Sequence, residues 1–166
     1  MRSLKRRRRE NITDYGKRLK LLKGGFPRLV FRKTNKYLIS QYISSKQAKD
    51  TVELGVTSNS LMKYGWPEES KGSLKSISAA YLTGFLMGKL ILKNKKKNPI
   101  MDFGMLKTIP KSNIYSFIKG VIESGVEIKC KESSFPDKER INGKFLKKDF
   151  TKTFEEIKSK INKEQK

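Results

Sequence analysis

The sequence of 166 residues contains no histidine and a single cysteine, Cys130. Without histidine there is no Ser-His-Asp triad, no Cys-His nucleophile and no histidine-ligated metal site. One cysteine excludes a disulfide within these residues, which fits a reducing compartment. We therefore expect no catalytic residue, no metal and no cofactor, and we interpret Cys130 as a small apolar filler.

Acidic residues are also scarce, since 16 Asp or Glu stand against 39 Lys or Arg, giving a formal charge of +23. The excess is concentrated at the start, because residues 1–36 hold fourteen basic residues and two acidic ones. Net charge does not determine a fold, but the release of counterions from phosphates drives such a chain onto a polyanion. The balance favours a nucleic-acid partner over a protein that is merely basic.

Long apolar runs are missing as well. The longest, residues 77–92, includes Lys89 and is shorter than the roughly 20 residues that a membrane span requires. We predict instead a helix buried against a sheet, in which Gly84 and Gly88 allow close approach. The basic N-terminus is not followed by an apolar segment, so no secretory signal is expected. We expect neither a membrane nor a small-molecule substrate as partner.

The N-terminal part is predicted to be a basic arm. Residues 1–11 cannot bury apolar surface and should be disordered until bound. A short basic helix follows, with Thr13 as its N-cap, Asp14 in its first turn and Gly24 as its stop.

Patterns of two and of 3.6 residues predict the remaining elements. Strands are expected at 27–33, 36–44, 50–57, 98–106 and 126–130, helices at 73–97, 112–125 and 149–162, and loops at 59–73 and 135–145. The order of the main elements, β-β-β-α-β-α, indicates an α/β sandwich with a mixed sheet, a basic N-terminal extension and a C-terminal helix. We divide the chain into an extension (1–27), an α/β RNA-binding domain (28–130) and a loop with an amphipathic helix (131–166).

Two motifs resemble catalytic sequences without the required context. Gly84-x-x-x-Gly88-Lys89 is one residue short of a phosphate-binding loop and lies inside a helical run. Asp102-Phe103-Gly104 matches the magnesium triplet of kinases, but the chain lacks the histidine of their catalytic loop. We expect Asp102 to bind local backbone and Gly104 to open a turn.

The predicted hairpin of residues 28–42 combines positive charge with aromatic side chains: Arg28, Arg32, Lys33, Lys36, Tyr37 and Tyr42. Unstacked RNA bases stack on aromatic rings while Arg and Lys bind phosphates, so this hairpin favours an RNA-binding role. Alternation places Leu29 and Phe31 on one face and Arg28, Val30 and Arg32 on the other. Ordinary strand packing for the tyrosines and a solvated turn for the cations remain alternatives. The arginines at 6–9 are also typical of a nuclear-targeting signal or a solubilising tail.

Several segments in order resemble a known family. They are "RRRRENITDYGKRLKLLKGGFPRLVFRKTNKYLISQYI" at 6–43, "KYGW" at 63–66, "AAYLTGFLMGK" at 79–89, "DFG" at 102–104, "KGVIESGVEI" at 119–128 and "PDKERINGK" at 136–144. This combination, within residues 5–145, resembles the archaeal and eukaryotic large-subunit ribosomal protein that binds 5S ribosomal RNA. The helix after residue 150 matches poorly in detail.

The resemblance implies a non-enzymatic α/β sandwich on the cytoplasmic ribosome. It implies binding to 5S rRNA, and anchoring of that RNA to the large-subunit rRNA and to neighbouring ribosomal proteins in the central protuberance. With the hairpin, it gives these expected RNA contacts: Arg6, Arg7, Arg8, Arg9, Asn11, Thr13, Tyr15, Arg18, Arg28, Arg32, Lys33, Thr34, Asn35, Lys36, Tyr37 and Gln41, with Trp66 either packing or contacting RNA. A nonspecific RNA chaperone or nucleic-acid-compacting protein is the main alternative. An RNA-processing enzyme would need clustered carboxylates or a metal site.

Overall fold

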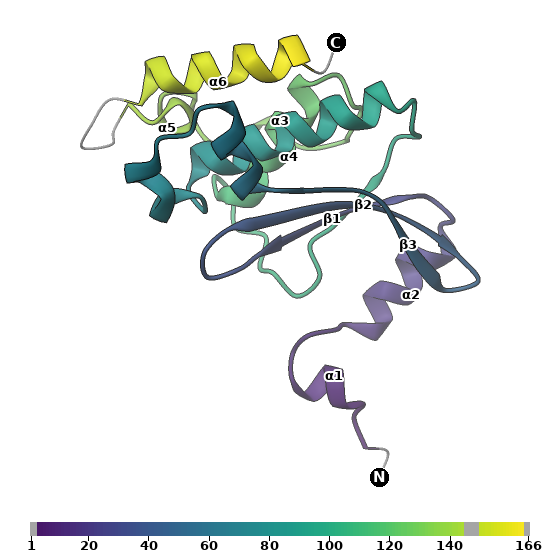
Figure 1. Ribbon diagram of the computed structural model, residues 1–166. Helices are drawn as coiled ribbons and strands as arrows, with labels where there is room; N and C mark the ends of the chain where they lie inside the picture. The colour runs from purple at the N-terminus through teal and green to yellow at the C-terminus, as the bar shows by residue number, and fades with distance from the viewer. Residues whose placement is uncertain (1–2, 145–149, 165–166) are drawn as a thin grey trace.

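A computed structural model describes residues 3–144 and 150–164 (Figure 1). Its helices and strands follow one another in this order: α1 (Arg6–Arg9), α2 (Tyr15–Lys23), β1 (Arg28–Lys33), β2 (Leu38–Lys46), β3 (Lys49–Thr57), the 3₁₀ helices η1 (Ser58–Tyr64) and η2 (Glu68–Ser73), α3 (Ile77–Lys93), β4 (Ile100–Asp102), α4 (Asn113–Glu123), η3 (Glu132–Ser134), α5 (Lys138–Asn142) and α6 (Thr151–Glu164). The predicted α/β class and the β-β-β-α-β-α order are confirmed.

The four strands form one mixed sheet in the order β3-β2-β1-β4. β1 is antiparallel to β2 and parallel to β4, and β2 is antiparallel to β3. The alternation predicted for β1 is confirmed, because Leu29 and Phe31 are fully buried on the inner face. Arg28 and Arg32 point to the other face, which we call the outer face.

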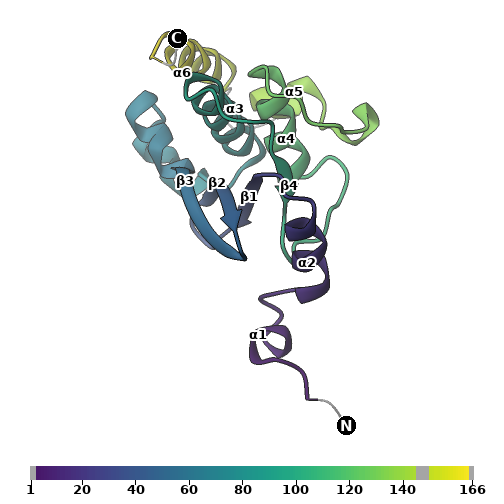
Figure 2. The same ribbon diagram turned by 90° about the vertical axis from the view of Figure 1, so that its right-hand side faces the viewer.

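Helices α3 and α4 cover the inner face, with α6 lying over α3 (Figure 2). Their backbones approach closely at glycines: a Cβ on Gly84 would lie 2.2 Å from the Phe117 carbonyl oxygen, and one on Gly120 would lie 2.2 Å from the Tyr81 carbonyl oxygen. The predicted close approach at Gly84 is thus confirmed, although its partner is helix α4 rather than the sheet.

The C-terminal helix belongs to the same core. Its predicted apolar stripe is confirmed, since Phe154, Ile157 and Ile161 are buried together with residues of the sheet and α3. The Lys158 ammonium reinforces the contact by donating to the Tyr81 hydroxyl at 2.6 Å and the Glu123 carboxylate at 3.1 Å. Burial, together with its hydrogen bond to the Glu123 carboxylate, raises the pKa of the Tyr81 phenol. Asp149, the first residue predicted for this helix, lies outside the described residues.

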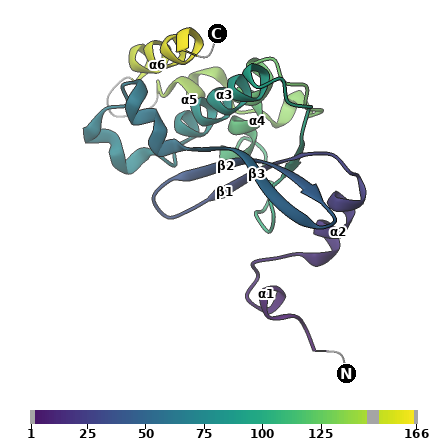
Figure 3. The same cartoon turned by 45° about the vertical axis from the view of Figure 1, so that its right-hand side comes forward.

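The N-terminal extension lies on the opposite side of the sheet from these helices (Figures 1 and 3). Helix α2 begins one residue later than predicted, because Asp14 is its N-cap and accepts the Lys17 backbone N–H at 3.2 Å. The Thr13 hydroxyl instead accepts Arg7 Nε at 3.0 Å. Gly24 ends the helix as predicted. Within the segment expected to be disordered, α1 forms a single turn that buries no side chain.

Three other predictions need correction. Residues 126–130 are not a strand, although Val126 is buried in the core. The polar segment 59–73 contains η1 and η2 instead of an irregular loop, and α5 lies inside the predicted loop 135–145, of which Phe145 is outside the described residues. These short helices leave little periodic signal, because even the longest, η1, repeats a buried apolar residue only once, at Leu61 and Tyr64.

Candidate RNA interface

An ionic network on the outer face joins the extension to the sheet. The buried Arg28 guanidinium donates to Asp50 at 2.7 Å and to Asp102 at 3.2 Å, and Arg18 of α2 donates to the other oxygen of Asp50 at 2.7 Å. Ser45 also donates to Asp50, at 2.6 Å. The extension is therefore fixed to the sheet through the Asp50 carboxylate of β3, while Asp102 of β4 binds Arg28 within the sheet.

The environment of Asp50 strongly favours its ionised form. Burial alone would raise its pKa, but hydrogen bonds from Ser45, Arg18 and Arg28 outweigh that effect and lower the pKa to about 2. Asp50 is therefore a carboxylate at neutral pH, and its charge is shared between the two arginines.

The turn after β4 completes the network. The Gly104 backbone N–H donates to the Asp102 carboxylate at 2.8 Å, and Gly104 has φ +57°. Arg32 donates to the Asp102 carbonyl at 2.8 Å, and Lys17 donates to the Gly104 carbonyl at 3.3 Å. The structural role predicted for the Asp-Phe-Gly triplet is confirmed. Asp102 also acts as a buried counter-ion for Arg28, which the sequence did not indicate.

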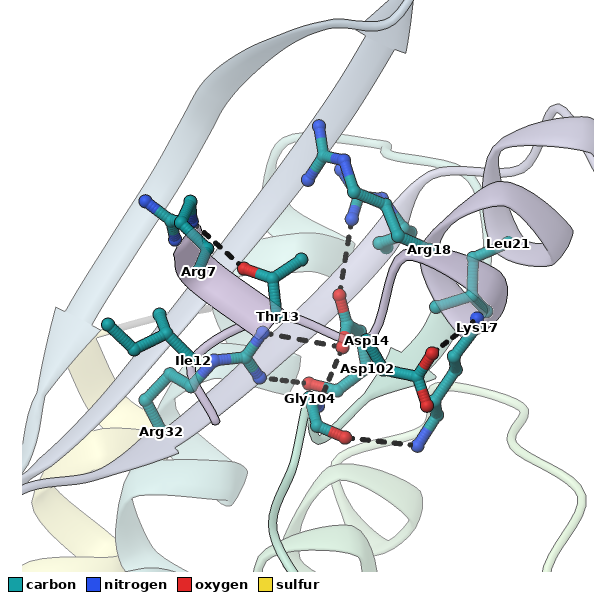
Figure 4. A pocket seen from close by; sticks show the side chains of 11 residues that line it. Arg7, Ile12, Thr13, Asp14, Lys17, Arg18, Leu21, Arg32, Asp102 and Gly104 are labelled. Atoms are coloured by element: carbon teal, nitrogen blue, oxygen red, sulfur yellow. Dashed lines mark hydrogen bonds and ion pairs between the residues drawn. The ribbon is translucent and has the colours of Figure 1, made fainter. Parts of the chain in front are cut away.

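A cleft of about 160 Å³ lies between α2 and the outer face (Figure 4). Its lining is rich in cations, including Arg7, Lys17, Arg18 and Arg32, whereas Asp14 and Asp102 supply the acidic groups. The arginines at 7 and 32 come from segments far apart in sequence, yet their side chains face the same cleft. The folded extension thus gathers positive charge at one edge of the sheet.

The turn between β1 and β2 forms a second basic and aromatic site, which we call the hairpin tip (residues 33–37). The Thr34 hydroxyl donates to the Tyr37 carbonyl at 2.6 Å and accepts the Tyr37 backbone N–H at 3.0 Å. Lys75 donates to the Asn35 carbonyl at 3.0 Å, so the tip is also tied to the start of α3. Lys33, Lys36 and Tyr37 remain exposed.

An open cleft of about 550 Å³ separates the hairpin tip from η2. It is lined by Asn35, Lys36 and Tyr37 on one side and by Asn59, Lys71, Gly72 and Leu74 on the other. Tyr37 is 38% exposed and lines this cleft. Exposed aromatic and cationic groups beside a cleft can accept an unstacked base and its phosphate.

Two predicted RNA contacts are corrected by burial. Arg28 is 3% exposed and its guanidinium binds Asp50 and Asp102. It therefore links β1 to β3 and β4 and has a structural role. Trp66 is 4% exposed, packs against Phe150 in a tilted arrangement with ring centroids 4.8 Å apart, and donates Nε1–H to the Ser70 carbonyl. The packing role that the sequence left open for Trp66 is therefore the one observed.

Tyr42 is also not the exposed ring that the hairpin pattern suggested. It is 3% exposed and donates its hydroxyl to the Lys97 carbonyl at 3.0 Å, so ordinary strand packing applies. The other expected contacts are exposed or partly exposed: Arg6, Arg7, Arg8, Arg9, Asn11, Thr13, Tyr15, Arg18, Arg32, Lys33, Thr34, Asn35, Lys36, Tyr37 and Gln41.

Among residues 3–144 and 150–164, no three Cys, Asp or Glu side chains are grouped so that they could hold a metal ion. No helix in those residues is long and apolar enough to cross a membrane. Cys130 is half-buried against the core, where burial raises the pKa of its thiol, which agrees with the expected filler role. Together, the mixed sheet and the cation-lined clefts of the outer side define a basic α/β protein.

Comparison with known proteins identifies the family. The model of a family described as "Ribosomal large subunit proteins 60S L5, and 50S L18" matches residues 1–102. The chain is 40% identical over 141 residues to the large ribosomal subunit protein uL18 of Korarchaeum cryptofilum, covering 85% of this chain and 70% of that protein. The uL18 of Methanoregula boonei is 33% identical over 165 residues, covering 96% and 92%. The chain belongs to this family, and is a structural component of the large ribosomal subunit and not an enzyme.

Proposed function

We propose that the chain binds 5S rRNA and anchors it to the large-subunit rRNA in the central protuberance of cytoplasmic ribosomes. The observation that carries the proposal is the cationic outer side of the molecule. There the folded extension, Arg32 and the hairpin tip present positive charge that the protein's own carboxylates do not neutralise. Family membership supports a ribosomal RNA as the polyanion, and it supports neighbouring ribosomal proteins as further partners.

The two parts of this side have different roles. The arginines at 6–9 lie on an arm without buried side chains, so they can adapt to a phosphate backbone and supply salt-dependent affinity. The hairpin tip is held by the Thr34 and Lys75 hydrogen bonds and offers Tyr37, so it is suited to recognising RNA shape and a splayed base.

The test measures both affinity and specificity. Labelled 5S rRNA is bound by the purified protein at near-physiological salt, with transfer RNA as competitor. We expect transfer RNA to compete poorly. Equal competition would instead indicate the nonspecific chaperone, which binds any RNA through charge alone.

A matched pair of variants locates the contact. Lys33 and Lys36 are both replaced by alanine at the hairpin tip, and the control replaces Lys152 and Lys163, two exposed lysines of α6, which is packed on the far side from the extension. The tip variant should bind 5S rRNA on the order of tenfold more weakly, because two phosphate contacts are lost. If both variants lose the same affinity, the hairpin tip is not a specific contact.

A further inference from the structure

A group of lysines that the expected RNA contacts do not include lies at the opposite end of the sheet from the hairpin tip. It consists of Lys46 and Lys49, which flank the β2–β3 turn, of Lys93, the last residue of α3, and of Lys95, Lys96 and Lys97, which follow the C-cap Asn94. All six residues are exposed. We call this group the lysine cluster.

Two contacts bring its parts together. Lys96 pairs with Glu53 of β3 at 2.7 Å, and the buried Tyr42 hydroxyl of β2 donates to the Lys97 carbonyl at 3.0 Å. Lys46 is also close enough to help lower the pKa of Glu53, after the hydrogen bonds from Lys96 and Ser44. Glu53 therefore lies among cations from both segments, so the turn and the helix end form one surface.

The backbone of this surface is fixed and partly strained. At the C-terminal end of α3, the Lys95 backbone N–H donates to the Leu92 carbonyl at 2.9 Å and the Lys96 backbone N–H donates to the Ile91 carbonyl at 3.0 Å. This is the hydrogen-bond pattern of a Schellman cap. Glycine usually occupies the left-handed position of that cap, but here Lys95 does, with φ +50°. In the β2–β3 turn, Gln47 and Ala48 have φ +49° and +62°, where Asn-Gly is preferred. Backbone of this kind persists where surrounding contacts hold it in place, and it is enriched at functional sites.

We infer that the lysine cluster is a second RNA-binding surface, which binds the phosphate backbone of a helical RNA segment while the first RNA occupies the extension and the hairpin tip. The inference rests on the proposed function, since it assigns to that function the surface for the second of two RNAs. The length of β2 separates the lysine cluster from the hairpin tip, and nine residues of strand span about 27 Å. Helix α2 lies nearer to the cluster, since its Arg18 binds Asp50 beside Lys49. An RNA segment bound at the hairpin tip therefore leaves the lysine cluster accessible to a second segment.

The chemistry of the cluster favours RNA over a protein partner. Of the six ammonium groups, Lys96 pairs with Glu53 and Lys93 donates to the Glu164 carbonyl oxygen at 3.2 Å. The neighbouring Asp50 carboxylate is already paired with Arg18 and Arg28, so the surface keeps a positive excess. Lysine is depleted in the cores of protein–protein interfaces, whereas exposed lysines on a fixed loop suit phosphates. Cations in the last turn of a helix are favoured by the helix dipole, which would explain Lys93. Lys95, Lys96 and Lys97 lie beyond the end of α3, so the dipole does not explain them.

The test uses the full chain saturated with unlabelled 5S rRNA and a fluorescent 20-base-pair RNA duplex as probe. Lys93, Lys95 and Lys97 are replaced together by alanine, which spares the Lys96–Glu53 pair. The control replaces Lys129, Lys131 and Lys138, three exposed lysines of another segment. Anisotropy is recorded over a range of salt concentrations, and 5S rRNA binding is measured separately for each protein.

The parent complex should bind the duplex. The cluster variant should bind it at least about tenfold more weakly, with a log–log salt slope smaller by about 2 to 3 units, because three counterion-releasing contacts are lost. The control should match the parent, and all three proteins should bind 5S rRNA equally.

The inference is overturned if the parent complex does not bind the duplex. That result would indicate that the lysine cluster binds an acidic protein instead. The inference is also overturned if the cluster variant equals the parent, or if that variant loses 5S rRNA binding to the same extent, because the lysines would then belong to the first site. Failure of the parent to prefer 5S rRNA over transfer RNA would refute the proposed function by a separate measurement.

Discussion

Replacing Arg28 by alanine should destabilise the fold and leave RNA affinity unchanged. The Arg28 side chain is 4% exposed and pairs with Asp102, which is 8% exposed, and with Asp50, which is 27% exposed. Removing one partner of a buried ion pair costs about 3–5 kcal/mol, because the remaining charge is left without compensation. Here Arg18 still contacts Asp50 and Arg32 still contacts Asp102, so we expect about 3 kcal/mol, at the lower end of that range.

For a chain of this size, a loss of about 3 kcal/mol lowers Tm by roughly 6–12 °C. Circular dichroism during heating and urea titration measure the two quantities, and 5S rRNA affinity is measured at a temperature where the variant is folded. Arg32→Ala is the matched control: its side chain is 41% exposed, so we expect less than about 1 kcal/mol of destabilisation but weaker RNA binding. The reasoning is refuted if Arg28→Ala keeps the parent Tm and loses RNA affinity as Arg32→Ala does.

Two further predictions concern stability. The Asp50 carboxyl has a pKa of about 2 when folded and about 3.9 when unfolded, so its interactions contribute about 2–3 kcal/mol above pH 4. This contribution is lost as the pH falls toward 2. Urea titrations should show the stability difference between parent and Asp50→Asn shrinking over that window, and a constant difference would contradict the prediction. Gly120→Ala should lower the free energy of unfolding by about 1–3 kcal/mol, because its Cβ would meet the Tyr81 carbonyl oxygen at 2.2 Å. Gly72→Ala is the control and should leave the free energy of unfolding nearly unchanged, since its Cβ would have nothing within 4 Å. Equal effects of the two substitutions would show that α3 and α4 separate freely.

Much of the fold could be predicted because its signals are local. The β1 alternation, the apolar stripe of α6 and the small residues of α3 each follow from a period within one element. The stripe of Phe154, Ile157 and Ile161 is buried as the pattern requires, and the Asn-containing turn after β1 is in place. The short 3₁₀ helices and α5 could not be predicted, since none of them is long enough to repeat an apolar position more than once.

The site was predicted less completely, because burial of a charge depends on residues distant in sequence. Arg28 precedes Asp50 by 22 positions and Asp102 by 74, and α2 lies over this part of the outer face. On the strand alone, Arg28 and Arg32 look equivalent, although the structure buries the first and leaves the second partly exposed. The burial of Trp66 was equally hard to predict, since its packing partner Phe150 lies 84 positions later in the sequence.

The few carboxylates near the extension explain how so basic a segment can fold before RNA is present. Asp14 caps α2, Asp50 holds Arg18 and Arg28, and Asp102 holds Arg28 and Arg32. Each carboxylate is placed where it fixes the direction of a guanidinium at close range. Together with Glu10, which pairs with Arg6, these carboxylates supply four negative charges, which cannot neutralise the fourteen basic residues of positions 1–36. The long-range field therefore stays positive while the local geometry is set. A fixed guanidinium loses less conformational entropy when it binds phosphate, so acids that weaken the total charge can still strengthen binding.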